Sequence, residues 1–134
     1  KIRAAKVERA ADSIPLQVFE NGNAQSDALI IGWGSTYGSI TTAVRELNQE
    51  GFDIAQIHIK YLSPFPKNLG ELIGSFKRVF VAEMNNGQLI KVIRDKFMVD
   101  AIGINKIQGQ PFQVIEIKEN LKQYLNAWKQ PNIN

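Results

Sequence analysis

The sequence predicts an α/β fold: a three-layer α/β/α sandwich built on about five strands, mostly parallel, with one strand antiparallel. Short apolar runs alternate with segments of helical periodicity along almost the whole chain. Parallel neighbours need long crossovers, which the helical segments supply. The first run joins the second through a connection too short for a helix, so we expect that strand to be the antiparallel one. The length of 134 residues suits a single domain with one substantial core.

The first 14 residues are expected to lead into the domain rather than belong to it. Arg3 to Ala11 has apolar residues at helical spacing, and Pro15 ends that pattern. Leu16 to Glu20 then alternates apolar with polar residues, as a short edge strand does. Because the chain begins with Lys1 and shows no signal peptide, we expect a piece of a longer chain, with residues 1–14 as a linker helix and 15–134 as the domain.

Four units of a strand followed by a helix make up the rest of the chain. They pair Ala28–Gly32 with Thr41–Asn48, Ile54–Leu62 with a helix that Asn68 caps, Val79–Ala82 with Gln88–Phe97, and Ala101–Ile107 with a closing helix that carries Val114, Leu121 and Trp128. In the second of these strands the polar residues share one side, so that side is expected to be less buried.

Composition excludes several classes of protein. Apolar residues at 44% and charged residues at 22% are typical of a soluble domain, and no apolar run approaches the roughly 20 residues of a membrane span. The net charge of +3 is spread along the chain without a basic stripe interleaved with aromatics, which argues against nucleic-acid binding. The chain has no cysteine, so it forms no disulfide and ligates no iron–sulfur cluster, which fits a reducing cytoplasm.

Two glycine-bearing segments, GWGSTYGS (residues 32–39) and EMNNGQL (residues 83–89), each follow an apolar strand. In α/β proteins the carboxyl ends of strands are where sites form. The spacing of Gly32, Gly34 and Gly38 departs from the dinucleotide fingerprint, and no acidic residue ends the next strand to hold a ribose. These glycines can also serve only a tight turn and a close helix approach, whereas Ser35 and Thr36 offer an anion contact at a helix start.

No catalytic residue and no metal ligand set is predicted. Glu83 follows a strand, where it can either accept backbone N–H groups near a helix start or pair with a partner subunit, but no second carboxylate or base lies beside it. His58 is the sole histidine, which excludes a His-based metal cluster and favours a structural or surface role.

Four motifs in order, GSTYG, LSPFP, E-x-N-x-GQL and GQPF, resemble the C-terminal part of the alpha subunit of 2-oxoacid:ferredoxin oxidoreductases, most closely the 2-oxoglutarate type. The resemblance covers nearly the whole chain. The lead-in RAAKVERAADSIP is similar to the segment that joins this domain to a pyrimidine-binding domain in that family, while Asn86 stands where the family has a larger residue.

The resemblance implies a domain like the transketolase C-terminal domain, non-catalytic, inside an enzyme that decarboxylates a 2-oxoacid and forms acyl-CoA. Thiamine diphosphate, Mg, iron–sulfur clusters and CoA are then cofactors of the parent complex and not of this fragment. The implied partners are the beta subunit, the pyrimidine-binding domain of the same subunit and, through the complex, ferredoxin; a homo-oligomer is left open.

The resemblance also selects the candidate residues for inter-subunit or CoA-proximal contacts: Gly34, Ser35, Thr36, Gly38, Glu83, Asn85, Gly87 and Gln88. The alternative is a free-standing module that binds a small anionic ligand or a nucleotide at the turn from Gly34 to Thr36.

Overall fold

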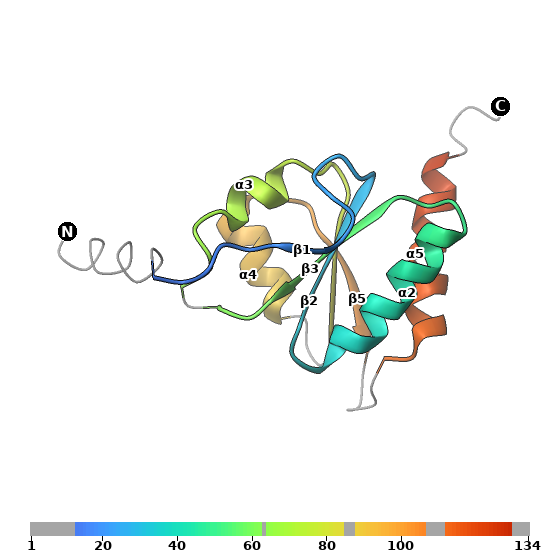
Figure 1. The fold of residues 1–134 in the computed structure, drawn as a ribbon, viewed down its shortest axis with the longest axis horizontal. Helices are drawn as coiled ribbons and strands as arrows, with labels where there is room; N and C mark the ends of the chain where they lie inside the picture. Colours follow the sequence, from blue (N-terminus) through green and yellow to red (C-terminus); the bar gives the residue numbers. More distant parts are fainter. Residues whose placement is uncertain (1–12, 63, 85–87, 107–111, 130–134) are drawn as a thin grey trace.

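A five-stranded sheet lies at the centre of the fold, with its strands in the order β1-β3-β2-β4-β5 (Figure 1). The computed structural model describes residues 13–62, 64–84, 88–106 and 112–129. Pairing is parallel throughout, except that β1 runs antiparallel to β3. The strands are β1 (Phe19–Asn21), β2 (Ala28–Trp33), β3 (Ile54–Ile59), β4 (Val79–Met84) and β5 (Ile102–Lys106). The predicted fold class, including the single antiparallel strand, is confirmed.

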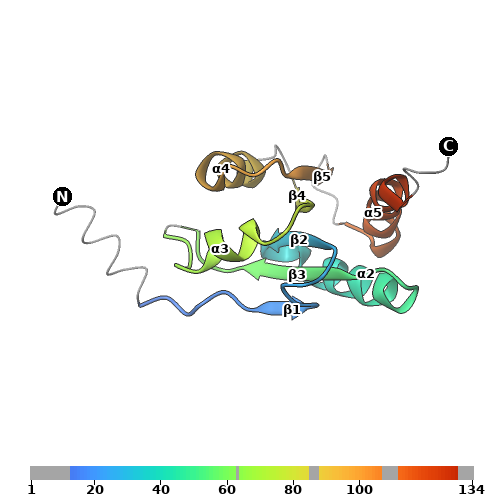
Figure 2. The same cartoon turned by 90° about the horizontal axis from the view of Figure 1, so that it is seen from above.

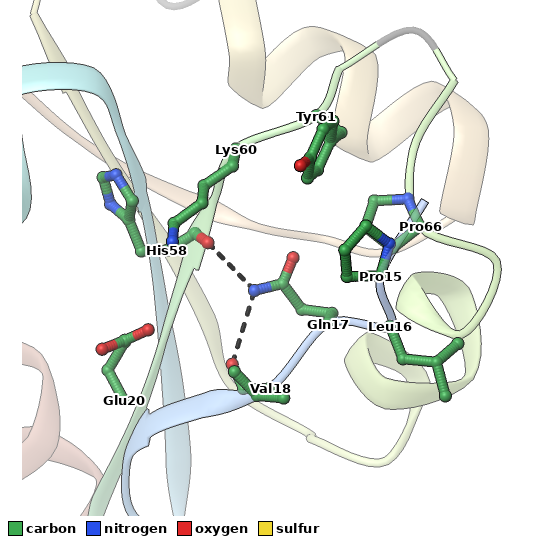
Figure 3. Close-up of a pocket in the computed structure, with 9 residues that line it drawn as sticks. All are labelled: Pro15, Leu16, Gln17, Val18, Glu20, His58, Lys60, Tyr61 and Pro66. Atoms are coloured by element: carbon green, nitrogen blue, oxygen red, sulfur yellow. Dashed lines mark hydrogen bonds between the residues drawn. The ribbon is translucent and has the colours of Figure 1, made fainter. Parts of the chain in front are cut away.

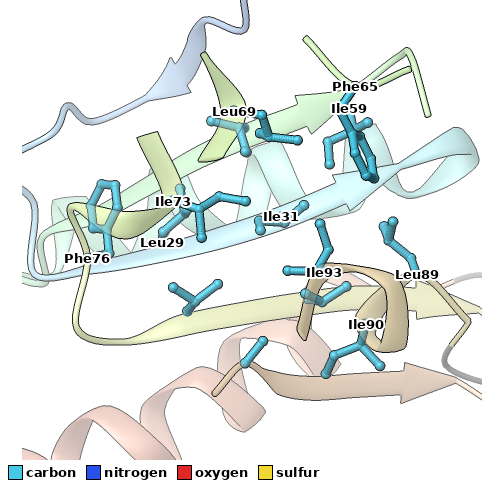
Figure 4. Close-up of a cluster of buried hydrophobic side chains, with 14 of the residues drawn as sticks. Leu29, Ile31, Ile59, Phe65, Leu69, Ile73, Phe76, Leu89, Ile90 and Ile93 are labelled. Atoms are coloured by element: carbon cyan, nitrogen blue, oxygen red, sulfur yellow. The ribbon is translucent and has the colours of Figure 1, made fainter. Parts of the chain in front are cut away.

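Helices cover both faces of the sheet, as Figure 2 shows from above. They are the 3-10 turn η1 (Gly34–Thr36) and the helices α2 (Tyr37–Gln49), α3 (Leu69–Gly74), α4 (Gln88–Phe97) and α5 (Val114–Lys129). The apolar faces of α3 and α4 pack on one side of the sheet in the cluster drawn in Figure 4, and those of α2 and α5 pack on the other. Because β2 is buried on both sides, its side chains belong alternately to the two clusters.

The strand β3 differs from expectation in where it ends and in the burial of one polar residue. It ends at Ile59, three residues before the predicted end, and Lys60 to Leu62 are exposed. On the side of β3 that was expected to be less buried, His58 is half-buried, as expected, but α2 covers Gln56, which is 1% exposed. The Gln56 amide donates to Thr41 Oγ1 at 2.9 Å and accepts from Asn21 Nδ2 at 2.7 Å. Because its amide nitrogen and oxygen each have a hydrogen-bond partner, this polar side chain can be buried there.

Asn68 lies at the N-cap of α3, as predicted, but its side chain does not cap the helix. Instead, its Oδ1 accepts the Gln17 backbone N–H at 2.8 Å and its Nδ2 donates to the Gln17 carbonyl at 3.0 Å. This two-point contact takes the place of strand pairing for Gln17, so β1 begins at Phe19 rather than at the predicted Leu16.

The expected lead-in helix falls on residues 1–12, which lie outside the described residues, so the boundary at residue 14 stays a prediction. Among the helices of the described ranges, none combines the length and apolar character that crossing a bilayer demands.

Candidate functional site

The two glycine-bearing segments meet at one edge of the sheet. The strands β2 and β4 are parallel neighbours with Gly32 beside Ala82, so their carboxyl ends lie together and η1 contacts β4. After β2 the chain passes to α2 on one face, whereas after β4 it passes to α4 on the other. Adjacent strands whose helices leave to opposite faces form a topological switch point, the usual place for a site in an open α/β sheet.

The described residues of the four sequence motifs lie at this switch-point edge or are bonded to the start of α2 beside it. GSTYG supplies η1 and the start of α2. Leu62 and Phe65 of LSPFP line the same cavity as Gln88 and Leu89 of E-x-N-x-GQL. The Ser39 hydroxyl on α2 donates to the carbonyl of Phe112, the described residue of GQPF, at 2.6 Å. Residues far apart in sequence are therefore brought together here by the fold.

The turn after β2 needs its glycines for two different reasons. Gly34 has a left-handed backbone with φ of 67°, which glycine adopts without strain, and it is exposed together with Ser35. A Cβ on Gly32 would lie 2.9 Å from Thr36 Oγ1 and even closer to Ile40 Cδ1, so only glycine lets α2 approach β2. Thr36 is buried, and its hydroxyl donates to the Trp33 carbonyl at 2.9 Å. Gly38 is exposed on the first turn of α2.

Glu83 acts as an anchor for α4. It is 3% exposed, and its two carboxylate oxygens accept the backbone N–H groups of Leu89 and Ile90, each at 2.9 Å. Of the two roles expected for Glu83, acceptance of N–H groups at a helix start is confirmed. A negative charge is favourable at this end of a helix because the N–H groups and the helix dipole both stabilise it. Its role in a subunit contact stays a prediction.

Beside Glu83, Gln88 is exposed on the first turn of α4. The other two candidates of this motif, Asn85 and Gly87, lie outside the described residues.

An apolar cavity of about 190 Å³ opens on the switch-point edge. We call it the Trp33 groove; its lining residues are Trp33, Leu62, Phe65, Gln88, Leu89 and Val92. Trp33 is 40% exposed and Val92 is 46% exposed, although both are large apolar side chains. Sequence reasoning missed this groove, but the tryptophan within GWGSTYG and the leucine of LSPFP were available as signals.

Tyr37 connects the glycine turn to the edge of the sheet. Its hydroxyl donates to Glu20 Oε1 at 2.9 Å, and its ring meets the His58 ring edge-to-face, with 5.0 Å between centroids. The hydrogen bond to Glu20 is the main cause that raises the pKa of Tyr37. Burial lowers the pKa of His58, while the charge of Glu20 acts in the opposite direction. Within the described residues, His58 Nδ1 is buried without a hydrogen-bond partner.

The exposed groups of this edge favour contact over acid–base chemistry. Among the described residues, its buried carboxylate is bonded to α4, and its exposed groups include a glycine turn, the Ser35 hydroxyl, an amide and apolar side chains. Across the ranges that the structure describes, no three acidic or histidine side chains gather to hold a metal ion.

Comparison with known proteins gives one family. Residues 26–122 match the family model described as pyruvate:ferredoxin oxidoreductase core domain II. The 2-oxoglutarate oxidoreductase subunit KorA of Mycobacterium tuberculosis is 37% identical over 117 residues, which is 87% of this chain and 18% of that protein. The 2-oxoacid:ferredoxin oxidoreductase subunit alpha of Saccharolobus solfataricus is 34% identical, over 90% of this chain and 20% of that protein. The chain therefore spans about a fifth of the length of these relatives.

A solved structure shares the fold. The 2-oxoglutarate:ferredoxin oxidoreductase from Magnetococcus marinus, with 2-oxoglutarate, coenzyme A and succinyl-CoA bound, superposes with a TM-score of 0.81 at 29% identity. The match covers 90% of this chain and 22% of that one.

Proposed function

Because the chain belongs to the pyruvate:ferredoxin oxidoreductase core domain II family, we propose that it is the docking domain of the alpha subunit of a 2-oxoglutarate-type oxidoreductase. The parent enzyme would decarboxylate 2-oxoglutarate oxidatively, form succinyl-CoA and pass electrons to ferredoxin. The names of the relatives and the ligands of the Magnetococcus enzyme support this choice of substrate.

One observation carries the docking role: the described residues of the family motifs gather at or beside a single edge whose exposed groups are suited to contact. The exposed Gly34 and Ser35, the Gln88 amide and the Trp33 groove lie side by side there. Large apolar side chains in a concave surface are typical of the centre of a protein interface. The candidate residues on this edge would then contact the pyrimidine-binding domain, the beta subunit or bound CoA.

The cofactors of the parent complex would be held elsewhere. The described residues offer no cluster of metal ligands, and the sequence has no cysteine for an iron–sulfur cluster. Thiamine diphosphate, Mg and the clusters therefore belong, in this proposal, to the pyrimidine-binding domain and other subunits. The proposed parent complex would be cytoplasmic, in keeping with the absence of cysteine from this sequence.

The docking role is tested in the full alpha subunit co-expressed with its beta subunit. Trp33→Ser and Val92→Ser should each reduce co-elution of the two subunits, and 2-oxoglutarate-dependent ferredoxin reduction should fall about tenfold, as for an interface hot spot. The matched control is Ile115→Ser, an exposed apolar residue on α5 that should change neither measurement. Unchanged assembly and turnover in both groove variants would reject the docking role.

The free-standing module makes the opposite prediction. Titration of the chain with CoA, thiamine diphosphate and nucleotides would then show saturable binding near one ligand per chain, and Gly34→Val would abolish it. The docking proposal expects no saturation from the domain alone. Neighbouring genes for a beta subunit and an upstream pyrimidine-binding domain would support docking independently.

A further inference from the structure

A second cavity, of about 220 Å³, lies at the outer edge of the sheet (Figure 3). It forms where the chain before β1 diverges from the end of β3. The segment from Pro15 to Val18 forms one wall, and His58, Lys60 and Tyr61 form the other. We call it the edge cavity. It is separate from the Trp33 groove, with which it shares no lining residue.

The walls of the edge cavity are fixed by hydrogen bonds. Asn68 holds the backbone of Gln17 at two points, and Gln17 Nε2 donates to the His58 carbonyl at 2.9 Å. The wall before β1 is therefore tied to both α3 and β3. Small-molecule sites are usually preformed in this way, with mostly apolar linings and few polar groups.

One part of the lining is apolar and largely unburied. Leu16 is 52% exposed, Val18 is 61% exposed, and Tyr61 is also exposed, with Pro15 and Pro66 beside them. Figure 3 shows Tyr61, Pro15, Pro66 and Leu16 on one side of Gln17 and the charged residues on the other. Apolar side chains that line a concave surface gain free energy when a ligand removes them from water.

The charged part of the lining carries both signs. Glu20 and Lys60 both border the cavity, yet no ion pair joins them within the described residues. Glu20 Oε1 accepts the Tyr37 hydroxyl, which holds this carboxylate toward α2. The lining thus offers a carboxylate for an ammonium group and an ammonium for a carboxylate, with an apolar wall beyond them.

We propose that the edge cavity binds a free apolar α-amino acid. The ligand's carboxylate pairs with Lys60, its ammonium pairs with Glu20, and its side chain lies against Leu16, Tyr61 and the prolines. The cavity is smaller than the roughly 300 to 1,000 Å³ of sites for drug-sized ligands, which suits a molecule of this size. This proposal does not depend on the docking role of the switch-point edge.

The test is a titration of the chain with L-leucine, followed by two-dimensional NMR of the backbone amides. Saturable shifts are expected at Gln17, Val18, Lys60 and Tyr61. Three probes test which groups of leucine contribute to binding. 4-Methylpentanoate lacks the ammonium group, 3-methylbutylamine lacks the carboxylate, and glycine lacks the apolar side chain. Each should bind about tenfold more weakly than leucine, because each loses one charged contact or the apolar contact.

Charge variants identify the contacts. Lys60→Gln and Glu20→Gln should each weaken leucine binding about tenfold, with the dispersed spectrum of the folded chain retained. Their matched controls are Lys77→Gln and Glu119→Gln, two exposed residues that do not line the cavity and should leave binding unchanged. Leu16→Ser probes the apolar wall and should also weaken binding.

Several results would overturn the proposal. Absence of saturation with leucine would do so, as would equal affinity for leucine and 4-methylpentanoate, which would indicate an anion site only. Insensitivity of binding to Lys60→Gln would place the ligand elsewhere. Tighter binding of a capped leucine-containing peptide than of free leucine would make the cavity a peptide-docking surface instead.

Discussion

Glu83 and Leu89 are joined by a hydrogen bond of 2.9 Å between a buried carboxylate at the end of β4 and the first turn of α4. With the matching bond to Ile90, it fixes where α4 leaves the sheet and therefore where Gln88 and Val92 face the Trp33 groove. Glu83 thus builds the edge on which docking is proposed.

Loss of the Glu83 carboxylate should destabilise the chain strongly. Glu83→Ala leaves two buried N–H groups without acceptors, and we expect the free energy of unfolding to fall by about 3 kcal/mol, as for lost hydrogen bonds to a charged group. Urea unfolding followed by circular dichroism measures this. Glu71→Gln, an exposed acid in the first turn of α3, is the control and should change stability by less than about 0.5 kcal/mol. Equal effects of the two substitutions would contradict the anchoring role.

Gly32 and Gly38 should respond oppositely to alanine. At Gly32 the new Cβ would clash with Thr36 and Ile40, and overpacking of this kind destabilises by about 1 to 3 kcal/mol. At Gly38 the new Cβ would have no atom within 4 Å beyond its chain neighbours and the backbone of its own helix, and alanine should stabilise α2 by about 0.5 to 1 kcal/mol. Thermal unfolding of the two variants gives the comparison. Destabilisation by Gly38→Ala would contradict the open space found at this position.

Asn68 should control whether the segment before β1 stays attached. Asn68→Ala removes both bonds to Gln17, so the amides from Gln17 to Asn21 should exchange with deuterium about 5 to 30 times faster, as expected for a loss of about 1 to 2 kcal/mol. Asn68→Asp keeps the acceptor for the Gln17 N–H but not the donor, and should have an intermediate effect. Unchanged exchange in Asn68→Ala would mean that other contacts hold this segment.

The stability of the chain should fall as the solution becomes acidic, in part through His58. Burial lowers the pKa of His58 below the 6.5 of an unperturbed histidine, so the unfolded chain binds the proton first. The contribution of His58 to stability is fully present above pH 6.5 and is lost as the pH falls from there through its folded pKa. The charge of Glu20 limits the loss, and that of Lys60 adds to it.

The measurement for His58 is the urea midpoint at several pH values between 5 and 8. His58→Phe keeps an aromatic ring against Tyr37 but cannot titrate, so its midpoint should depend less on pH in this range. An identical pH profile for the variant and the unmodified chain would exclude His58 as a source of the dependence.

Much of the fold followed from local patterns. Alternating apolar strands and amphipathic helices predicted the three layers, and the short connection from Asn21 to Ala28 predicted the antiparallel pair. The errors fell where tertiary contacts override local preference. Gln56 alternates with apolar residues in β3, but the helix α2 covers it and Thr41 and Asn21 satisfy its amide. Asn68 is of a residue type that commonly caps helices, but its side chain hydrogen-bonds Gln17, which lies 51 positions away in sequence.

The sequence by itself determined the α/β class, the position of both glycine-bearing segments at strand ends and the family that their motifs resemble, because these depend on residue types at short spacing. Only the tertiary structure decided that the described residues of the motifs gather at or beside one switch-point edge, that Glu83 is bonded to α4, and that Trp33, Leu62 and Val92 form a groove. Strand order and helix direction bring those residues together. Neither is encoded in the spacing of any single motif, because both are set by the packing of all the layers at once.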